Sequence, residues 1–291
     1  MKKTSLYPMV EFKKATYELD EFDAASIFVL VGEEKALVID AGMGIGDLLT
    51  AVRRITDKPL VLAITHGHVD HIMHSCQFDE CYLNEADWPM FFDDVERRKY
   101  DTGLIAQRQK GIYAYDMERD ITPWEKTAKL LPLNEGWSID LGGRVIRAYA
   151  APGHSKGSMI FLDEKTRTLF AGDALNNNLL LAMTMDPSKE TYVPLEDALK
   201  GLLTMEALGD KYDDIFNGHH DFRPLGVPLK KEILPNAIAM LRQIMDGSAA
   251  YETQQNKLFP HLTDTIVRMG EGWVTVDPRF LPQKEKTKRK S

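Results

Sequence analysis

Apolar runs separated by short polar breaks mark the first third of the chain. Residues 15–22 alternate polar and apolar side chains, and the apolar runs 26–32 and 35–42 are separated by two glutamates, so this part is expected to form a β-meander. Residues 46–56 carry apolar side chains at helical spacing, and residues 60–65 form a short apolar strand. The order strand, helix, strand predicts a βαβ unit with functional loops at the carboxyl ends of strands.

The pattern changes between residues 84 and 131, which are charged, aromatic and mostly helical in periodicity. We interpret this segment as a helical insertion between two sheet-forming halves. Strand patterns return at 137–141, 144–153, 158–174, 213–220 and 272–278, and helical patterns at 194–209 and 230–247. Because no Gly/Ser-rich or Pro-rich linker divides the chain, residues 1–283 are expected to form one domain, followed by a basic, disordered tail at 284–291.

Composition narrows the class of protein. The 291 residues are 44% hydrophobic and 27% charged, as in a compact globular protein. The net charge of −8 disfavours nucleic acid as a partner, and no apolar run approaches the ~20 residues that cross a bilayer. The two cysteines, Cys76 and Cys81, suggest neither a disulfide framework nor a thiolate site. We therefore expect a cytoplasmic protein that binds a small-molecule substrate and not a membrane; a homodimer is left open.

The first chemical signal is a cluster of histidines directly after the strand at 60–65. His66, His68, His71 and His74 are four of the eight histidines in the chain, and packing alone would leave their ring nitrogens costly to bury. In "HGHVDH" the rings of His66 and His68 can point to one side, and Asp70 and His71 follow at once. The segment could therefore offer four ligands to two neighbouring metal ions.

Further ligands are expected at other strand ends. His154 in "APGHSKGS", Asp173 in "AGDAL" and His219 in "NGHH" each follow a glycine after an apolar strand or a turn. Five imidazoles and two carboxylates suit a two-metal hydrolytic site. We expect two divalent ions, zinc first, with iron and manganese as alternatives that the same ligands accept.

The ordered series of these motifs, with "LVIDAG" at residues 37–42, resembles the metallo-β-lactamase superfamily over about residues 17–225. The resemblance implies an α/β fold with a four-layer αββα sandwich. It also implies that His66, His68 and His154 hold one metal, that Asp70, His71 and His219 hold the other, and that Asp173 bridges them. Asp40 would then orient a metal-bound histidine.

The remaining polar residues are assigned by their place in these motifs. His220 beside His219 is expected to support the ligands, whereas His74 is expected at the surface or the pocket rim, and His261 at the surface or in a structural role. Asp70 is the candidate catalytic residue, because it could steer the attacking hydroxide or pass a proton to the leaving atom. Packing is the first interpretation of the aromatic residues in the insertion, with a substrate-covering or dimer role as the alternative. The candidate substrate contacts are Ser155, Asn176, Trp88 and Tyr115.

Two dications ~3.5–4 Å apart can share a water and depress its pKa toward neutrality, so no protein nucleophile is required. The bridging aspartate and the expected cytoplasmic location disfavour lactam cleavage, and the second histidine of H-x-H disfavours the di-iron oxidoreductases of the same fold. The ligand types resemble those of hydroxyacylglutathione hydrolases and lactonases, although their basic C-terminal glutathione-binding segment has no match here. The sequence therefore predicts a dinuclear hydrolase of a small ester, thioester or lactone that uses a metal-bridging hydroxide. A small-molecule phosphodiesterase is the alternative, followed by a di-iron redox protein or a non-catalytic metal-binding protein.

Overall fold

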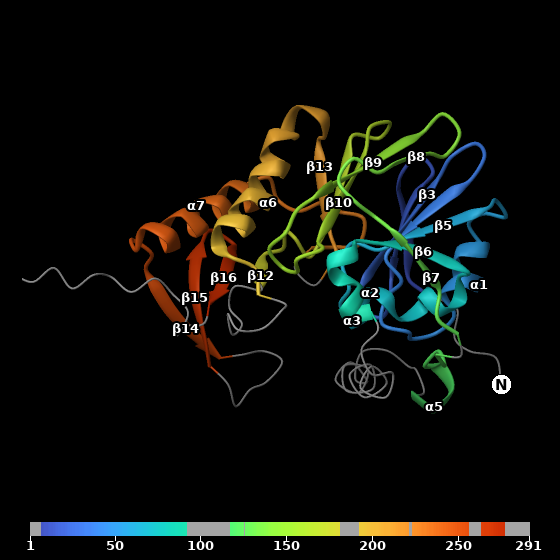
Figure 1. Ribbon diagram of the computed structural model, residues 1–291, viewed down its shortest axis with the longest axis horizontal. Helices are drawn as coiled ribbons and strands as arrows, with labels where there is room; N and C mark the ends of the chain where they lie inside the picture. Colours follow the sequence, from blue (N-terminus) through green and yellow to red (C-terminus); the bar gives the residue numbers. More distant parts are fainter. Residues whose placement is uncertain are drawn as a thin grey trace, which may run out of the picture.

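A computed structural model describes residues 7–91, 117–124, 126–180, 192–220, 223–255 and 263–276. Its strands form three sheets (Figure 1). The first sheet has seven strands in chain order: β1 (Met9–Lys13), β2 (Thr16–Asp20), β3 (Ser26–Val31), β4 (Ala36–Ile39), β5 (Leu60–Ala63), β6 (Glu80–Leu83) and β7 (Lys129–Pro132). Strands β1 to β4 are antiparallel, and β4 to β7 are parallel, with helix α1 (Leu48–Arg53) between β4 and β5. The predicted meander and βαβ unit are confirmed.

The second sheet has five strands, in the order β13 (Asp214–Asn217), β11 (Thr168–Gly172), β10 (Met159–Asp163), β9 (Val145–Ala150) and β8 (Ser138–Asp140). Helices α6 (Leu195–Ala207) and α7 (Ile233–Asp246) contribute buried apolar side chains to one core cluster with its strands β10 and β11. The shorter helices are α2 (Val69–Ile72), α3 (Trp88–Phe91) and α5 (Met117–Asp120), with 3-10 turns η1 (Met73–Gln77), η2 (Glu85–Asp87) and η4 (Gly209–Lys211).

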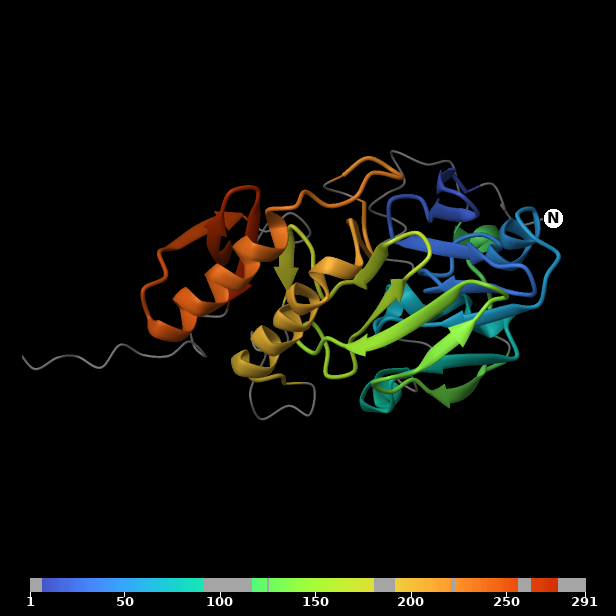
Figure 2. The same cartoon turned by 90° about the horizontal axis from the view of Figure 1, so that it is seen from above.

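The alternating side chains of the buried strands explain the layers. In β3, Phe28 and Leu30 join the cluster between the two sheets, while Ile27 and Val29 point to the opposite face, where α1 packs. In β10, Phe161 faces the first sheet, whereas Ile160 and Leu162 face α6 and α7. The two sheets with helices on their outer faces form the αββα arrangement that the sequence predicts (Figure 2).

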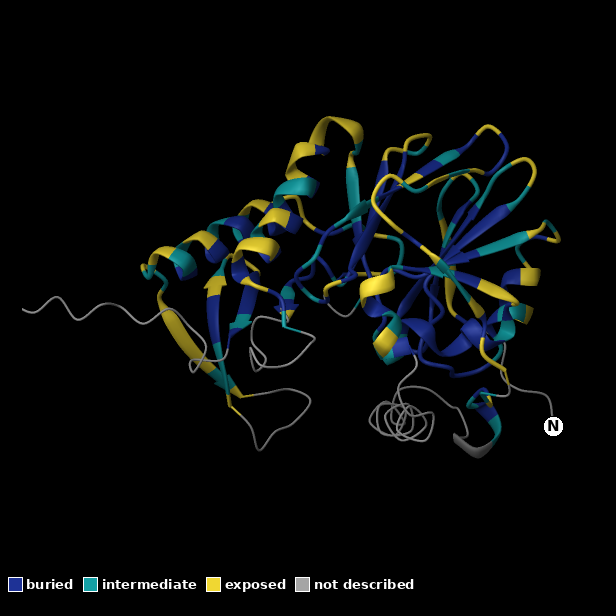
Figure 3. Ribbon diagram, in the orientation of Figure 1, coloured by how far each residue is buried: buried dark blue, intermediate teal, exposed yellow. Residues whose placement is uncertain are grey.

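A third sheet was not predicted. Its order is β12 (Asn178–Leu180), β16 (Gly272–Val276), β15 (Thr263–Met269) and β14 (Tyr251–Gln255), and it packs on α7. Burial falls toward β14, most of whose residues are exposed (Figure 3). Strand β12 carries the chain directly from the motif around Asp173 into this sheet, so the third sheet lies beside the predicted site.

The predicted insertion needs one correction. Residues 129–132 form β7, which pairs in parallel with β6, so a helical segment cannot extend to residue 131. The pattern "KLLP" is too short to show the alternation that identifies a strand. Residues 92–116, the tail at 284–291 and His261 lie outside the described residues. Across the described ranges, no helix combines the length and apolar character that a membrane crossing requires.

Candidate metal centre

The predicted ligands converge at one edge of the paired sheets. His66 and His68 follow β5, and α2, which begins directly after His68, carries Asp70 and His71. The other three ligands leave the second sheet: His154 follows β9, Asp173 follows β11 and His219 follows β13. Parallel strands bring their carboxyl ends to the same edge, which explains how residues as far apart in the chain as His66 and His219 meet here.

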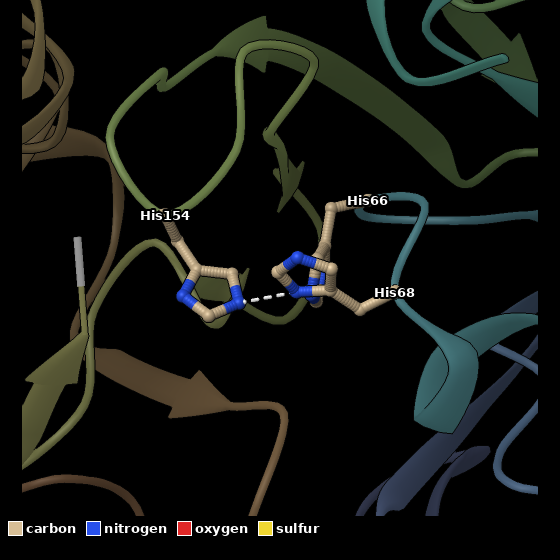
Figure 4. Close-up of side chains that lie close together, drawn as sticks. All are labelled: His66, His68 and His154. Carbon is tan, nitrogen blue, oxygen red and sulfur yellow. Dashed lines mark hydrogen bonds between the residues drawn. The ribbon is translucent and has the colours of Figure 1, made fainter. Parts of the chain in front are cut away.

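The donor atoms form groups compact enough for a metal ion. His66, His68 and His154, which we call the first donor group, have donor atoms within 4.8 Å of one another. Figure 4 shows the three side chains close together, with a dashed line between His68 and His154. The two atoms that this contact joins, His68 Nδ1 and His154 Nε2, are 2.7 Å apart. Asp70, His71 and His219, the second donor group, meet the same 4.8 Å limit.

Asp173 lies between the two donor groups. Its Oδ2 is 3.6 Å from His154 Nε2 in the first group and 3.1 Å from His219 Nε2 in the second. Its Oδ1 is 3.7 Å from His71 Nε2. This is the position that a bridging carboxylate would need.

Asp40 orients two of the ligand histidines. Its Oδ1 accepts from the Thr65 backbone N–H (2.7 Å), and its Oδ2 accepts from the Thr65 hydroxyl (2.9 Å) and from His71 Nδ1 (3.0 Å). Because the Thr65 hydroxyl proton goes to Asp40, its oxygen accepts from His66 Nδ1, 3.0 Å away. In its neutral form, each of these imidazoles therefore carries its proton on Nδ1 and presents the Nε2 lone pair to the site.

His154 is oriented by a different part of the fold. Its Nδ1 lies 2.7 Å from the backbone oxygen of Leu180, the last residue of β12. Since β12 pairs with β16, the third sheet supports the first donor group through this contact.

The pKa values of the ligand histidines are shifted in opposite directions in the two donor groups. Burial, reinforced by the neighbouring rings His71 and His154, holds the pKa of His66 well below its usual value. Burial and His154 lower the pKa of His68 to about 4. These two imidazoles are therefore neutral near pH 7 and their lone pairs are available to a cation.

In the second donor group, the pKa of a ligand histidine is raised. Although burial opposes charge on His71, the carboxylates of Asp70, Asp40 and Asp173 raise its pKa to about 9. Burial likewise opposes the charge on Asp173, but His219 and His71 hold the pKa of its carboxyl well below the usual range. Protons and metal ions compete for these lone pairs, so the negative potential that attracts a proton to His71 would also attract a cation.

The buried polar atoms fit a metal site. Among the described residues, His66 Nε2, His71 Nε2 and Asp173 Oδ1 are buried without a hydrogen-bond partner. Such atoms are costly unless a ligand satisfies them. All three point into the donor groups, and imidazole with carboxylate is a donor set that zinc, iron and manganese accept.

Two further histidines that the sequence analysis singled out, His220 and His74, lie outside both donor groups. His220 Nε2 lies 2.9 Å from Asp20 Oδ1 and 3.7 Å from Asp23 Oδ1, and it belongs to neither donor group. The expectation for His74 is wrong: it is fully buried, and its Nδ1 lies 3.0 Å from the Ala41 oxygen. Helix α2 passes into the 3-10 turn η1 at Met73, which directs His74 into the core.

The predicted substrate contacts have little structural support. Ser155 is 3% exposed and donates to Asp87, and Asn176 is 9% exposed and accepts from Asn217. Trp88 packs against the core cluster of the first sheet and donates to the Leu83 oxygen. These positions argue for roles within the fold, and Tyr115 lies outside the described residues.

Three further residues support the site, and the sequence analysis did not identify them. Thr65 links Asp40 to His66, and Asp87 contacts both ligand loops. Glu21 is buried and accepts from the backbone N–H groups of residues 43–45, which follow Asp40, while burial raises the pKa of its carboxyl to about 8. Thr65 adjoins the first ligand, so its position could have identified it. Glu21 and Asp87 depend on contacts that only the fold reveals.

The chain is similar in sequence to curated proteins over about half of its length. The chain is 28% identical to the acyl-coenzyme A thioesterase MBLAC2 of Bos taurus over 173 residues, which cover 54% of this chain and 60% of that protein. It is 27% identical to the hydroxyacylglutathione hydrolase GloC of Haemophilus influenzae over 152 residues, 49% of this chain and 62% of that protein. The chain thus spans about three fifths of the length of these relatives.

Solved structures confirm the fold. A metallo-β-lactamase from Pontibacter korlensis superposes with a TM-score of 0.54 at 14% identity, covering 81% of this chain and 99% of that one. The family model of the metallo-β-lactamase superfamily matches residues 20–75 and 82–219, which include every residue of both donor groups and Asp173. The chain therefore belongs to the metallo-β-lactamase superfamily.

Proposed function

We propose that the chain is a dinuclear metal-dependent hydrolase that cleaves a small-molecule thioester, with esters and lactones as related alternatives. The observation that carries this proposal is the placement of Asp173 between two compact donor groups. One relative is named as a thioesterase for acyl-coenzyme A and another as a hydrolase of hydroxyacylglutathione. An acyl group carried on the thiol of coenzyme A or glutathione is a thioester, which supports this bond type.

The chain's own residues would divide the work as follows. The first donor group would hold one ion, the second donor group the other, and Asp173 would keep the two ions together. Two dications held in this way would depress the pKa of a water molecule and polarise a substrate carbonyl. Asp40 and Thr65 keep the ligand rings of His66 and His71 in the required tautomer.

Asp70 is the residue that we assign to proton movement. Its side chain is 22% exposed, against 12% for Asp173, and its Oδ2 lies 3.5 Å from His219 Nε2. Its carboxylate can therefore take a proton and return it toward the solvent side of the site. If it also holds a metal ion, the Asp70 carboxylate would be a weak proton acceptor, but a thiolate leaving group, whose thiol has a pKa of ~8.5, needs far less protonation than an alkoxide. This difference favours a thioester over an unactivated ester.

The proposal is tested with a substrate panel on the metal-loaded protein. Acyl-coenzyme A and hydroxyacylglutathione thioesters are compared with aryl esters, lactones and bis-aryl phosphodiesters. We expect the highest kcat/KM for a thioester and a loss of ~100-fold or more in Asp173→Ala, because each ion supplies several kcal/mol of transition-state stabilisation. Asp79→Ala is the matched control, since the Asp79 side chain is 96% exposed and pairs only with Lys126 among the described ion pairs. Preference for the phosphodiester would overturn the substrate class, and undiminished turnover by Asp173→Ala would overturn the two-metal site.

A further inference from the structure

One buried carboxylate outside the ligand set contacts both loops of the first donor group. Asp87 is 1% exposed and ends the 3-10 turn η2, shortly after β6. Its Oδ2 accepts from the backbone N–H of Gly67 (3.0 Å) and from the Ser155 hydroxyl (2.6 Å). Its Oδ1 accepts from the backbone N–H of Gly157 (2.8 Å). Three donors therefore satisfy a charge that would otherwise be costly to bury.

The partners of Asp87 are neighbours of the ligands. Gly67 lies between His66 and His68, and Ser155 directly follows His154. These contacts join segments 20 and 68 residues away from Asp87 in the chain. A single side chain thus ties together the two loops that supply every residue of the first donor group.

The two glycines show that this contact requires close approach. A Cβ atom on Gly67 would lie 2.9 Å from the Asp87 backbone oxygen, and one on Gly157 would lie 2.6 Å from Asp87 Cγ. Any side chain at either position would therefore displace Asp87 or the loop. The backbone N–H groups can reach the carboxylate only because both positions are glycine.

We propose that Asp87 is a positioning residue that sets the separation of the His66–His68 loop from the His154 loop, and thereby the affinity of the first donor group for its metal. The proposal rests on the proposed function only in taking this group as a metal site. Among the described residues, the side-chain hydrogen bonds of Asp87 go to the loops of the first donor group, whereas Asp40 supports the second donor group through His71. The effect of Asp87 should therefore fall on one of the two metals.

The test is a zinc titration of the metal-stripped full chain, followed by calorimetry, with cobalt absorption as a second readout. For Asp87→Ala we expect one site of wild-type affinity and one weakened by ~10- to 100-fold, the range for outer residues that orient metal ligands. Asp87→Asn should give a smaller loss, because its amide oxygen still accepts while its NH2 group faces a donor. Ser155→Ala, which removes one of the three contacts, should also give a smaller loss.

The matched control is Glu85→Gln in the same turn, because the Glu85 side chain is exposed and contacts Asn134 at 3.2 Å. Wild-type affinity at both sites in Asp87→Ala would overturn the proposal, and so would equal weakening of both sites, which is the result of a general loss of stability. If Asp87→Ala does not fold, Asp87→Asn and Ser155→Ala decide by the same criterion. A wild-type chain that binds two metals but cleaves no member of the substrate panel would refute the proposed function and leave this inference intact.

Discussion

Replacing Asp40 by asparagine should change the tautomers of two ligand histidines while leaving the fold in place. Asp40 accepts three hydrogen bonds, one from the Thr65 N–H, one from the Thr65 hydroxyl and one from His71 Nδ1. An asparagine offers one acceptor oxygen and one NH2 group, so in either orientation of the amide at least one present donor faces another donor. Asparagine also tolerates the left-handed backbone of residue 40, where φ is +65°.

The imidazole can avoid this contact between two donors by moving its proton from Nδ1 to Nε2. If the new NH2 group faces His71, the ring can accept at Nδ1 only by carrying its proton on Nε2, the atom that the metal would need. The Thr65 hydroxyl would then also accept from the amide and turn its proton toward His66 Nδ1. We expect metal affinity to fall by ~10- to 100-fold, together with a loss of ~1–3 kcal/mol in unfolding free energy for the disturbed buried hydrogen bonds.

The assay is equilibrium dialysis against buffered free zinc, with denaturant unfolding of the metal-stripped protein. Asp47→Asn is the matched control, because the half-buried Asp47 side chain caps α1 through the Thr50 N–H and an asparagine can keep that bond. Wild-type zinc affinity in Asp40→Asn would refute the tautomer reasoning, even if the variant were less stable.

Three further predictions follow from the same geometry. Gly218→Ala should weaken metal binding without unfolding the protein, because its Cβ would lie 2.5 Å from Asp173 Oδ1 and 2.7 Å from His71 Cε1. Gly209→Ala is the control, because its Cβ would have nothing within 4 Å, and equilibrium dialysis should show normal metal binding for this variant only. As pH falls from 9, the second donor group should lose its ion before the first. The reason is that protons compete with the metal for His71 below its raised pKa of about 9, but for His68 only near its lowered pKa of about 4. Simultaneous release of both ions in a cobalt-absorption titration would contradict this. Asp173→Ala should lose at least one metal equivalent by elemental analysis while keeping the wild-type circular dichroism spectrum, and two retained equivalents would exclude a bridging role.

The two central sheets could be predicted from the sequence, and seven candidate ligands could be proposed from it, because their signals are local. Residues 26–32 and 158–174 contain apolar strands with clear ends. Candidate ligands stand in the segments that leave strands, as His66, His154, Asp173 and His219 do, or in the short helix that follows, as Asp70 and His71 do. A glycine followed by histidine or aspartate at a strand end is visible without knowledge of the fold.

The third sheet and the residues that orient the ligands depend on contacts between distant segments. Strands β14 and β15 carry mixed polar residues, "YETQQ" and "TDTIVRM", with only two fully buried positions, so their pattern does not alternate clearly. Asp87 stands in a charged segment that has the periodicity of a surface helix, and its partners lie 20 to 70 residues away. His74 was misplaced because the change from helix α2 to a 3-10 turn alters which face of the chain meets the core.

The measurement that tests the central claim most directly is a crystal structure of the zinc-loaded chain with anomalous differences recorded at the zinc edge. Our account predicts two peaks ~3.5–4 Å apart, one among His66, His68 and His154, the other among Asp70, His71 and His219, with Asp173 between them. A single peak, or two peaks of which one lies away from these seven residues, would contradict it.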